Sequence, residues 1–555
     1  MRKKIEVKYP QSNGSFTDAI LRNRNMDRSE LLRNMSSVEP PQNMKDAQKA
    51  ADRIARAIKE NESIALYTDY DADGFGCGIV FTELMRNLPY DKFFVFFNTR
   101  SMGFGMNCKG IDMILEQQPD TKLIVTSDNG IVAFDAVDYA KSKGIDVIIT
   151  DHHMPDDSGK LPEAYAVVNP HRNDEVCEFR DFCGTGVLYK VLALVYFLLC
   201  KDTKVLNSVL DIVAVATIAD VVPLRGENRI FAKIGLSKMS QECRPQWSAF
   251  KRLGSTYTPL VSFTSKDVGF FVGPCINASS RMNGDISKPM TAFLDTKEHL
   301  VDYAIDELTK INDIRKTIQK ERTAEAMAQI AECDDRFILV QMHCCEEGVV
   351  GLVAGDICNT AYRPTIVLAK DENGNWKGSG RSIDGIHIKA MLDRVNKEDP
   401  SILLGYGGHS QACGLTVRSD KVDVLRKKLI SICNEIYEKT PEVFTEHIIV
   451  DYVVDDITKL PRLYTEKVAM EPFGCEFPEP VVMVRFKPDE TRILKNGKHL
   501  IFKYHGIDII SWNSGYKMNG RKPSEISEII AIGTIEKGNQ INCQHELLTL
   551  SFDEQ

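Results

Sequence analysis

The chain has 555 residues, which is too long for one ordinary hydrophobic core, so about two to four domains are expected. Its hydrophobic content of 43% and charged content of 26% are ordinary for a folded soluble protein. A formal net charge of −9 argues against a protein that coats nucleic acid over its whole surface, but it leaves room for a local basic groove.

The sequence predicts neither a membrane span nor a signal peptide. The longest apolar stretch, residues 187–200, is too short to cross a bilayer and contains Lys190. The amino-terminal residues lack the apolar core of a signal peptide. Fifteen cysteines without a paired framework favour a reducing compartment, so we expect a cytoplasmic protein.

The first predicted domain alternates strands with helices. Residues 1–45 are polar and interrupted by prolines, which predicts an irregular lead-in, and a helix is predicted over about 46–60. Short apolar strands then follow at 63–67, 92–97, 122–127, 146–150 and 165–168. Such alternation predicts a parallel sheet with helices on both faces. Ligands of such sheets bind beyond the carboxyl ends of the strands.

Three further segments follow along the chain. A helical stretch over about 299–331 carries apolar residues at steps of three and four. It either braces two domains or is a plain amphipathic helix of one domain. A second α/β segment is predicted at about 336–437. The last stretch, about 445–555, consists of short β-like runs between turn residues, which predicts a small closed or partly open β-barrel.

Acidic residues and histidines follow the ends of the predicted strands. They are Asp69, Asp71 and Asp73 after the first strand, Asp128 after the third, Asp151, His152 and His153 after the fourth, and Asp220 at the end of a later apolar stretch. Taken singly, each is more often a helix cap, a turn former or a surface group than a catalytic residue. Together they would meet at one rim of the sheet, where unneutralised carboxylates repel one another.

Divalent cations would remove this repulsion. Carboxylate oxygens with one or two imidazoles suit Mn²⁺ or Mg²⁺, and the imidazole favours Mn²⁺. Two ions about 3.5–4 Å apart would activate a water and stabilise an in-line displacement at phosphorus. The sequence therefore predicts a centre of two metal ions that acts on phosphoesters.

The same residues resemble the DHH phosphoesterase superfamily, named for the triplet seen here as Asp151, His152 and His153. From about residue 35 to 555 the chain resembles the RecJ branch of single-strand-specific 5′→3′ DNA exonucleases. Ten motifs match in the family's order: DYDADG, SDNGI, TDHHMP, VNPHR, GTGV, ATIADVVPL, GPCINASSRM, GSGRSIDG, GYGGHSQACG and EPFGCEFPEP.

The resemblance implies an α/β fold with a defined order of domains. After the lead-in over 1–45 it places a parallel-sheet DHH domain at 46–298 and a long connecting helix at 299–335. A smaller α/β DHH-associated domain follows at 336–440, and a C-terminal OB-like β-barrel at 441–555.

The resemblance also implies roles for the rim residues. The metal ligands would be Asp69, Asp71, Asp73, Asp128, His152 and Asp220. Asp128 would bridge the two ions, and His153 would lie near the scissile phosphate rather than bind metal. The catalytic group would comprise Asp71, Asp128 and His153.

A phosphate-binding wall is implied in the DHH-associated domain. Its residues would be Ser379, Arg381, Ser382, Gly407, Gly408 and His409. Glycines let backbone N–H groups approach a phosphate, and the arginine fork can bind two phosphate oxygens. Arg100 and Arg281 match family positions thought to contact DNA. The alternatives are a simple loop for GSGRS and ordinary surface positions for the two arginines.

The chain departs from the family's pattern at three places. A His-Pro-Gly-like stretch is missing around Glu346, Glu347 and Gly348, so His343 lies out of register. Cys413 stands where the family usually has alanine, and Ser279 and Ser280 replace the usual small Ala-Gly pair before Arg281. The metal set is intact.

The C-terminal barrel contains the basic and aromatic residues that single-strand-binding barrels use. They are Arg485, Phe486, Lys487, Arg492, Lys495, Lys498, Phe502, Lys503 and Tyr504. The alternative is a barrel with an ordinary charged face.

The expected function is a metal-dependent single-stranded DNA exonuclease, acting 5′→3′, releasing 5′-mononucleotides and serving DNA repair and recombination. One alternative is a phosphodiesterase of the same superfamily that acts on short oligonucleotides or cyclic dinucleotides. Another is a non-catalytic scaffold at replication forks. The resemblance implies single-stranded DNA as partner, with a single-strand-binding protein or a helicase as further partners, and a monomer that does not bind membranes.

Overall fold

The computed structural model describes residues 4–8, 15–103, 105–156, 158–199, 201–254, 260–283, 286–371, 374–494, 497–537 and 540–552. The chain forms two compact units. The smaller unit comprises Met1–Lys4, Pro274–Ala292 and Asp302–His447, and the larger one Ile5–Gly273, Phe293–Val301 and Ile448–Gln555.

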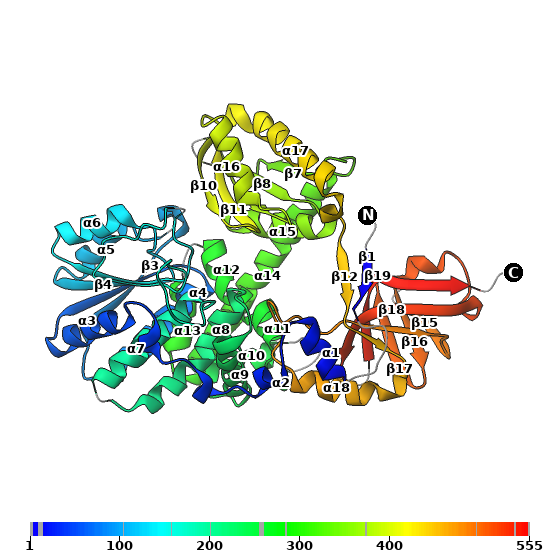
Figure 1. Cartoon of the computed structure of the whole chain (residues 1–555), viewed down its shortest axis with the longest axis horizontal. Helices are drawn as coiled ribbons and strands as arrows, with labels where there is room; N and C mark the ends of the chain where they lie inside the picture. Colours follow the sequence, from blue (N-terminus) through cyan, green and yellow to red (C-terminus); the bar gives the residue numbers. More distant parts are fainter. Residues whose placement is uncertain are drawn as a thin grey trace. The chain divides into compact units, whose positions relative to one another are not determined.

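The larger unit contains the predicted parallel sheet (Figure 1). Its five strands run in the order β3-β2-β4-β5-β6, and every neighbouring pair is parallel. They are β2 (Ser63–Thr68), β3 (Phe93–Phe97), β4 (Thr121–Ser127), β5 (Asp146–Thr150) and β6 (Ala166–Val168). All five predicted strands are confirmed. Their near-continuous apolar runs reflect burial on both faces, as in other parallel sheets.

Helices α3 (Ala47–Lys59), α4 (Ala72–Arg86), α7 (Gly184–Leu198) and α8 (Leu210–Ala219) pack beside this sheet. Most of α7 is formed by the apolar stretch that begins at residue 187 and is too short to span a membrane. This helix packs against α3, α4 and α8, so nearly all of its side chains are buried. No helix among the described residues combines the length and hydropathy that a membrane crossing requires.

The carboxyl-terminal part of the larger unit is an OB-like β-domain. Its strands form one sheet in the order β13-β14-β18-β19-β17-β16-β15. They are β13 (Tyr452–Val454), β14 (Val482–Phe486), β15 (Glu490–Leu494), β16 (His499–Tyr504), β17 (Ile507–Trp512), β18 (Ile526–Glu536) and β19 (Gln540–Phe552), with α18 (Leu460–Ala469) between the first two.

The prediction of an irregular lead-in is wrong for part of residues 1–45. Helix α1 (Phe16–Asn23) lies in this segment, and its buried Phe16 and Ile20 belong to the core of the C-terminal β-domain. The Phe16 ring meets the Tyr452 ring edge-on, with 5.2 Å between centroids. The apolar face of α1 is only two turns long, and it is completed by residues more than 400 positions away, which local patterning does not reveal.

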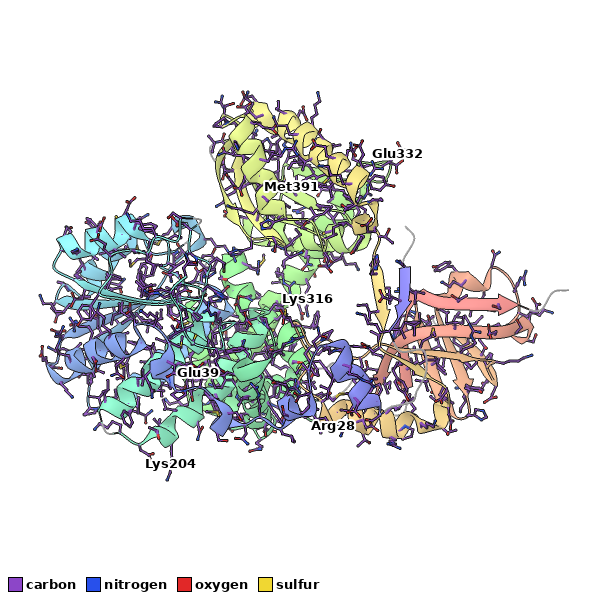
Figure 2. All side chains as sticks on the ribbon, in the orientation of Figure 1. Arg28, Glu39, Lys204, Lys316, Glu332 and Met391 are labelled. Atoms are coloured by element: carbon purple, nitrogen blue, oxygen red, sulfur yellow. The ribbon has the colours of Figure 1, made fainter. Side chains whose placement is uncertain are left out.

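The smaller unit has a mixed sheet in the order β10-β11-β9-β8-β7. Its strands are β7 (Ile338–Met342), β8 (Thr365–Lys370), β9 (Trp376–Arg381), β10 (Leu403–Gly408) and β11 (Ala412–Val417). Only β7 and β8 are parallel. Helices α15 (Glu347–Ala361), α16 (Ile388–Glu398) and α17 (Val422–Lys439) complete it, and Met391 of α16 is buried in the core (Figure 2). The predicted long helix is α14 (Glu298–Gln329).

Candidate metal centre

The first carboxylates lie at the junction of β2 and α4. The Asp71 carboxylate caps α4, since its Oδ1 accepts hydrogen bonds from the backbone N–H groups of Asp73 (3.0 Å) and Gly74 (3.1 Å). A Cβ at position 74 would lie 2.1 Å from the carbonyl oxygen of Asp69, so only glycine allows this tight turn. The turn holds Asp69 and Asp73 in the protein interior.

Asp73 is fixed by the amino-terminal end of α7. Its Oδ2 accepts from the backbone N–H of Gly184 (2.6 Å), and its Oδ1 accepts from that of Thr185 (2.8 Å). The Thr185 hydroxyl donates to the backbone carbonyl of Asp73 (2.8 Å). The first N–H groups of a helix have no partner within the helix, so the Asp73 carboxylate satisfies two of them and is held at the amino-terminal end of α7.

Asp128 follows β4 in a left-handed backbone conformation, with φ of 61°. Aspartate tolerates this region better than most residues. Helix α7 approaches so closely that a Cβ on Gly184 would lie 2.6 Å from the Asp128 Cβ and 2.7 Å from its Cα. Gly184 therefore sets the packing of α7 against both Asp73 and Asp128.

The loop after β5 is organised by Asp151, which is buried. Its Oδ1 accepts hydrogen bonds from the backbone N–H groups of His152 (2.7 Å) and His153 (3.0 Å), and its Oδ2 accepts from that of Ile131 (2.9 Å). The same Oδ1 lies 2.8 Å from Nδ1 of His153. Asp151 thereby orients both histidines, a role that the sequence did not predict.

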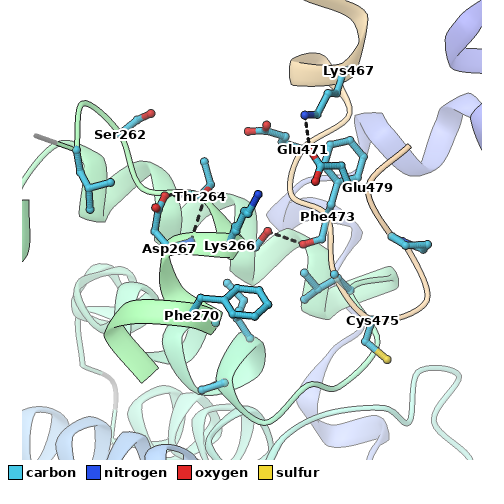
Figure 3. Close-up of a pocket in the computed structure, with 18 of the residues that line it drawn as sticks. Ser262, Thr264, Lys266, Asp267, Phe270, Lys467, Glu471, Phe473, Cys475 and Glu479 are labelled. Carbon is cyan, nitrogen blue, oxygen red and sulfur yellow. Dashed lines mark hydrogen bonds and ion pairs between the residues drawn. The ribbon is translucent and has the colours of Figure 1, made fainter. Parts of the chain in front are cut away.

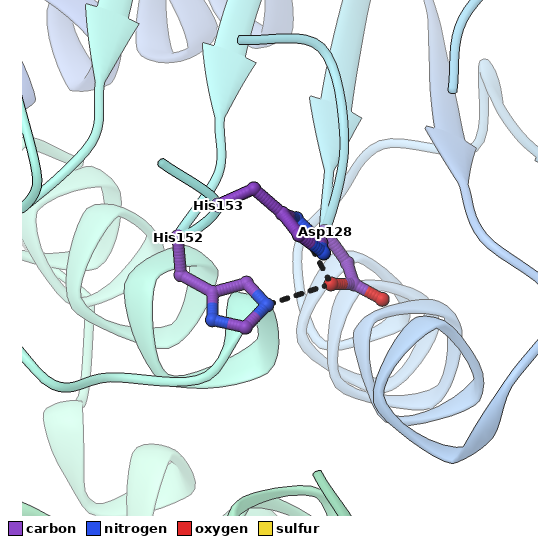
Figure 4. A group of neighbouring side chains, drawn as sticks. All are labelled: Asp128, His152 and His153. Carbon is purple, nitrogen blue, oxygen red and sulfur yellow. Dashed lines mark hydrogen bonds and ion pairs between the residues drawn. The ribbon is translucent and has the colours of Figure 1, made fainter. Parts of the chain in front are cut away.

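The predicted residues converge on one point. Nε2 of His152 lies 3.1 Å from a carboxylate oxygen of Asp128, 3.7 Å from one of Asp220 and 3.9 Å from one of Asp73. Figure 4 shows His152 and His153 both directed at the same carboxylate oxygen of Asp128. Two groups, Asp128 with His152 and His153, and Asp73 with His152 and Asp220, have ligand atoms within 4.8 Å of one another.

Burial and mutual repulsion dominate the electrostatics of the carboxylates. Burial, together with the charges of Asp73 and Asp71, raises the pKa of Asp128 and of Asp220 well above the ordinary range. Burial and the charge of Asp71 raise the pKa of Asp69 to about 7. The positive charges of His153 and Arg100 act on these carboxylates in the opposite direction but do not offset burial and repulsion.

The two histidines differ in protonation. Burial and the neighbouring His153 lower the pKa of His152 to about 4, so its imidazole is neutral and can donate an electron pair to a cation. Burial also disfavours the charged form of His153, but the Asp151 carboxylate outweighs it and raises the pKa of His153 to about 9. The pair thus combines a ligand-type imidazole with a positively charged one.

Asp69 and Asp71 lie at the edge of this cluster. Neither belongs to the two groups with ligand-atom spacing, although both carboxylates interact electrostatically with His153. Arg100 lies nearby, with its guanidinium 4.5 Å from the centre of the Tyr70 ring and its charge acting on Asp69. The donor set of carboxylate oxygens and neutral imidazole fits Mn²⁺ or Mg²⁺.

The predicted phosphate wall lies in the smaller unit. Nη1 of Arg381 donates to the Ser379 hydroxyl (2.9 Å) and to the Gly380 carbonyl (2.8 Å). Within the described part of the chain, no carboxylate lies within ion-pair distance of Arg381, and burial lowers its pKa. A Cβ on Gly351 of α15 would lie 3.1 Å from Nη2 of Arg381, so a glycine makes room for the fork.

The glycines of the wall lie on the neighbouring strands. Gly407 pairs with Gly414, which pairs with Ser379, and nothing lies within 4 Å of where a Cβ of Gly407 would be. Gly408, with φ of 138°, turns the chain before His409, whose backbone N–H donates to Ala412. The Ser382 hydroxyl donates to the Ile386 carbonyl (2.7 Å), which closes the loop after β9.

Cys413, Ser279 and Ser280, which differ from the family's pattern, do not lie on the face that carries Ser379 and Arg381. Cys413 pairs with Gly380, whose neighbours Ser379 and Arg381 face the other side of the sheet. The Cys413 side chain is therefore buried in the core, on the side opposite the phosphate wall. Ser279 and Ser280 are buried, while Nη1 of Arg281 donates to the Gly348 carbonyl (3.1 Å) at the start of α15.

The predicted base-stacking residues of the C-terminal domain are partly wrong. Phe486 and Phe502 are 4% and 0% exposed, because they alternate with polar residues and point into the core. Only Tyr504 of the predicted aromatics is partly accessible, and it packs against Phe486. Lys495 lies outside the described residues. The basic side chains of Arg485, Lys487, Arg492 and Lys498 are exposed, and that of Lys503 is partly so.

Replacing Asp151 by asparagine should lower kcat/KM about 10- to 100-fold, the usual effect of removing a residue that orients a ligand or catalytic histidine. Asparagine keeps the size but loses the charge that holds His153 protonated. Steady-state kinetics, with melting temperature measured in parallel, check this. Asp156→Asn is the matched control, because Asp156 forms only an exposed turn with Ser158; an equal loss in both variants would contradict the expectation.

Comparison with known proteins agrees with this geometry. The DHH family, N-terminal domain, matches residues 63–217; the DHHA1 domain matches 334–435; and the RecJ OB domain matches 451–547. The fold and site thus define a DHH-type protein with the carboxylate–histidine centre in its first domain.

Relatives and a solved structure narrow the class. The single-stranded-DNA-specific exonuclease RecJ of Escherichia coli is 31% identical over 489 residues, which cover 84% of this chain and 82% of that protein. The protein of the same name from Haemophilus influenzae is 30% identical over 76% of this chain and 74% of its own length. The crystal structure of Thermus thermophilus RecJ with Mn²⁺ has a TM-score of 0.81 over all of this chain and 80% of that chain, at 23% identity, which supports the fold. The chain belongs to the RecJ family.

Proposed function

We propose that this chain is a metal-dependent exonuclease that degrades single-stranded DNA by hydrolysing phosphodiester bonds. The observation that carries the proposal is the convergence of Asp73, Asp128 and Asp220 on Nε2 of His152. Relatives with this name cover most of the chain. We further propose that it starts at 5′ ends and releases 5′-mononucleotides.

The proposed ligands are Asp71, Asp73, Asp128, His152 and Asp220, with Asp69 beside them. When bound, two divalent ions supply an activated water and neutralise charge that develops at phosphorus. Asp128 is the proposed bridge, because it lies in one of the two ligand groups and its Oδ1 is nearest to the shared His152. The backbone N–H of Asp128 donates to the Thr150 carbonyl (3.1 Å), which anchors the residue at the end of β5.

The remaining residues bind and orient the substrate. His153, held by Asp151 and positively charged, is the proposed contact to the oxygens of the scissile phosphate. Arg381, Ser379 and the open glycine row would hold a phosphate of the DNA strand, and Arg100 and Arg281 would contact the strand. Partner proteins such as a single-strand-binding protein or a helicase, and a monomeric state, stay predictions.

Gel analysis of the purified chain with Mn²⁺ tests the proposal. Single-stranded and duplex oligonucleotides labelled at either end are incubated with the protein. A 5′-labelled single strand should release labelled mononucleotide at once, while a 3′-labelled one should shorten progressively and duplexes should persist. The opposite pattern would reverse the polarity, and intact single strands would refute the activity.

Replacing Arg381 by alanine should lower kcat/KM for oligonucleotides roughly 10- to 150-fold, because a charge-assisted hydrogen bond to phosphate contributes about 1.5–3 kcal/mol. Arg381→Lys should recover only part, since lysine lacks the fork. Arg394→Ala is the control, as Arg394 forms exposed ion pairs with Glu398 and Glu435 of the same unit. Kinetics on a single-stranded oligonucleotide check this; a loss in Arg394→Ala of similar size would contradict it.

A further inference from the structure

A cavity of about 1120 Å³ in the larger unit has no role in the site described above (Figure 3). It lies between the carboxyl end of α8, residues 260–270 and the loop 471–479 that leads into the C-terminal β-domain. Ile218 and Ala219 line it, and Asp220, a candidate metal ligand, follows them directly. The cavity and the metal centre therefore share the carboxyl end of α8.

The residue after Asp220 is strained and exposed. Val221 lines the cavity, is 66% exposed and has φ of 61°. A β-branched residue in the left-handed region is a backbone outlier that costs free energy, and such outliers cluster at functional sites. Glycine would adopt this conformation without strain, so the presence of valine here indicates that its side chain has a role.

A second backbone irregularity faces the same cavity. Residues Val268–Val272 form a π-helical turn, which is rare and frequent at functional sites. The turn leaves the Phe270 ring 77% exposed among the lining residues, and Val261, another lining residue, is 75% exposed. The π-helical turn packs against the end of α8. A Cβ on Gly273, the residue directly after the turn, would lie 3.1 Å from the Cβ of Ala219.

The charged residues that line the cavity nearly balance one another. The buried Lys467 is ion-paired with Glu479, and the exposed Lys266 lies 3.9 Å from Glu536. Asp267 and Glu471 add two negative charges, and the exposed Lys537 adds one positive charge. These residues therefore give the cavity no strong positive field that would attract the phosphates of a DNA strand. What the cavity offers a ligand is apolar surface with two lysines, Lys266 and Lys537, at exposed positions.

We propose that Val221, Val261 and Phe270 form an apolar platform that receives an unpaired base of the DNA strand beside the metal centre. The inference rests on the proposed function and deepens it. A base is flat, uncharged and apolar on its faces, and stacking on an aromatic ring tolerates any sequence. Bases in a duplex are already stacked and paired, so the platform favours the binding of single strands.

Phe270→Ala tests the platform. The variant should raise KM for a long single-stranded oligonucleotide roughly 10- to 100-fold, as expected for loss of one stacked base. It should leave hydrolysis of bis(4-nitrophenyl) phosphate unchanged, because that diester has no strand to reach the cavity. Phe197→Ala is the matched control, since Phe197 on α7 is 72% exposed and does not line the cavity.

Val221→Gly gives an independent readout. Relief of the left-handed strain should keep or raise the melting temperature, whereas loss of the side chain should raise KM for the oligonucleotide. An oligonucleotide with abasic sites should bind wild type and Phe270→Ala equally.

The outcomes separate this inference from the proposed function. If wild type cleaves neither the oligonucleotide nor the small diester, the proposed function fails. If wild type cleaves both and Phe270→Ala matches Phe197→Ala, only the platform is overturned. An unchanged KM with a shifted elution volume in Phe270→Ala would likewise overturn it, in favour of a contact between copies of the chain.

Discussion

Asp128→Asn should lower kcat by about 1,000-fold or more while leaving the fold intact. The substitution keeps the size of the side chain but removes the charge of the proposed bridging ligand, which lies within ligand distance of His152. Removing an outer partner of a metal ligand already costs 10- to 100-fold, so losing a bridging ligand should cost more. Single-turnover kinetics on a labelled oligonucleotide and Mn²⁺ titration by calorimetry measure the two consequences.

The melting temperature without metal should rise in Asp128→Asn. In the wild-type protein Asp128 is buried among like charges, and this repulsion destabilises the native state without cations. Added Mn²⁺ should stabilise wild type more than the variant, because binding to the native state alone adds to its stability. Asp112→Asn is a suitable control, since Asp112 is a half-exposed partner of Tyr139. Full activity in Asp128→Asn would contradict the proposed role of Asp128 as a metal ligand.

Gly184→Ala should be nearly inactive and less stable by about 1–3 kcal/mol, the usual cost of overpacking. The added methyl would lie 2.6 Å from the Asp128 Cβ and 2.9 Å from its backbone nitrogen, so α7 must move away. The N–H groups of Gly184 and Thr185 would then leave the Asp73 carboxylate. Both Mn²⁺ affinity and kcat should fall together.

Gly186→Ala separates this effect from the helix propensity of alanine. Gly186 lies half a turn further along α7, and its nearest neighbour to an added Cβ is a side-chain atom of Phe182 at 3.3 Å. Urea unfolding and metal titration of both variants check the expectation. If Gly184→Ala retains wild-type metal affinity, the contact between α7 and Asp128 does not position the ligand.

The sheet and the convergence of the rim could be predicted from the sequence because each depends on local patterns. Five apolar runs give the strands, and parallel strands bring Asp71, Asp128 and His152 to one edge. Residues that act by packing could not be predicted in this way. Gly184 is decisive because α7 touches Asp128, a contact between residues 56 positions apart.

The errors in the C-terminal domain have a simple physical origin. Composition alone favoured Phe486 and Phe502 as stacking residues, but strand alternation decides which face a residue occupies. Val482, Val484 and Phe486 share the buried face of β14, and Leu500 and Phe502 share that of β16. Alternation therefore predicts accessibility better than the count of aromatic residues.

The packing of α1 into the core of the C-terminal β-domain affects how the protein folds during its synthesis. Its Phe16 and Ile20 leave the ribosome first, yet their partners Tyr452 and Leu460 are synthesised more than 400 residues later. Until then a short amphipathic helix has no apolar surface to cover it, and nascent chains with such exposed faces are prone to aggregate. The core of the C-terminal domain is therefore completed only after these later residues have emerged, and a chaperone that shields α1 until then would benefit the yield.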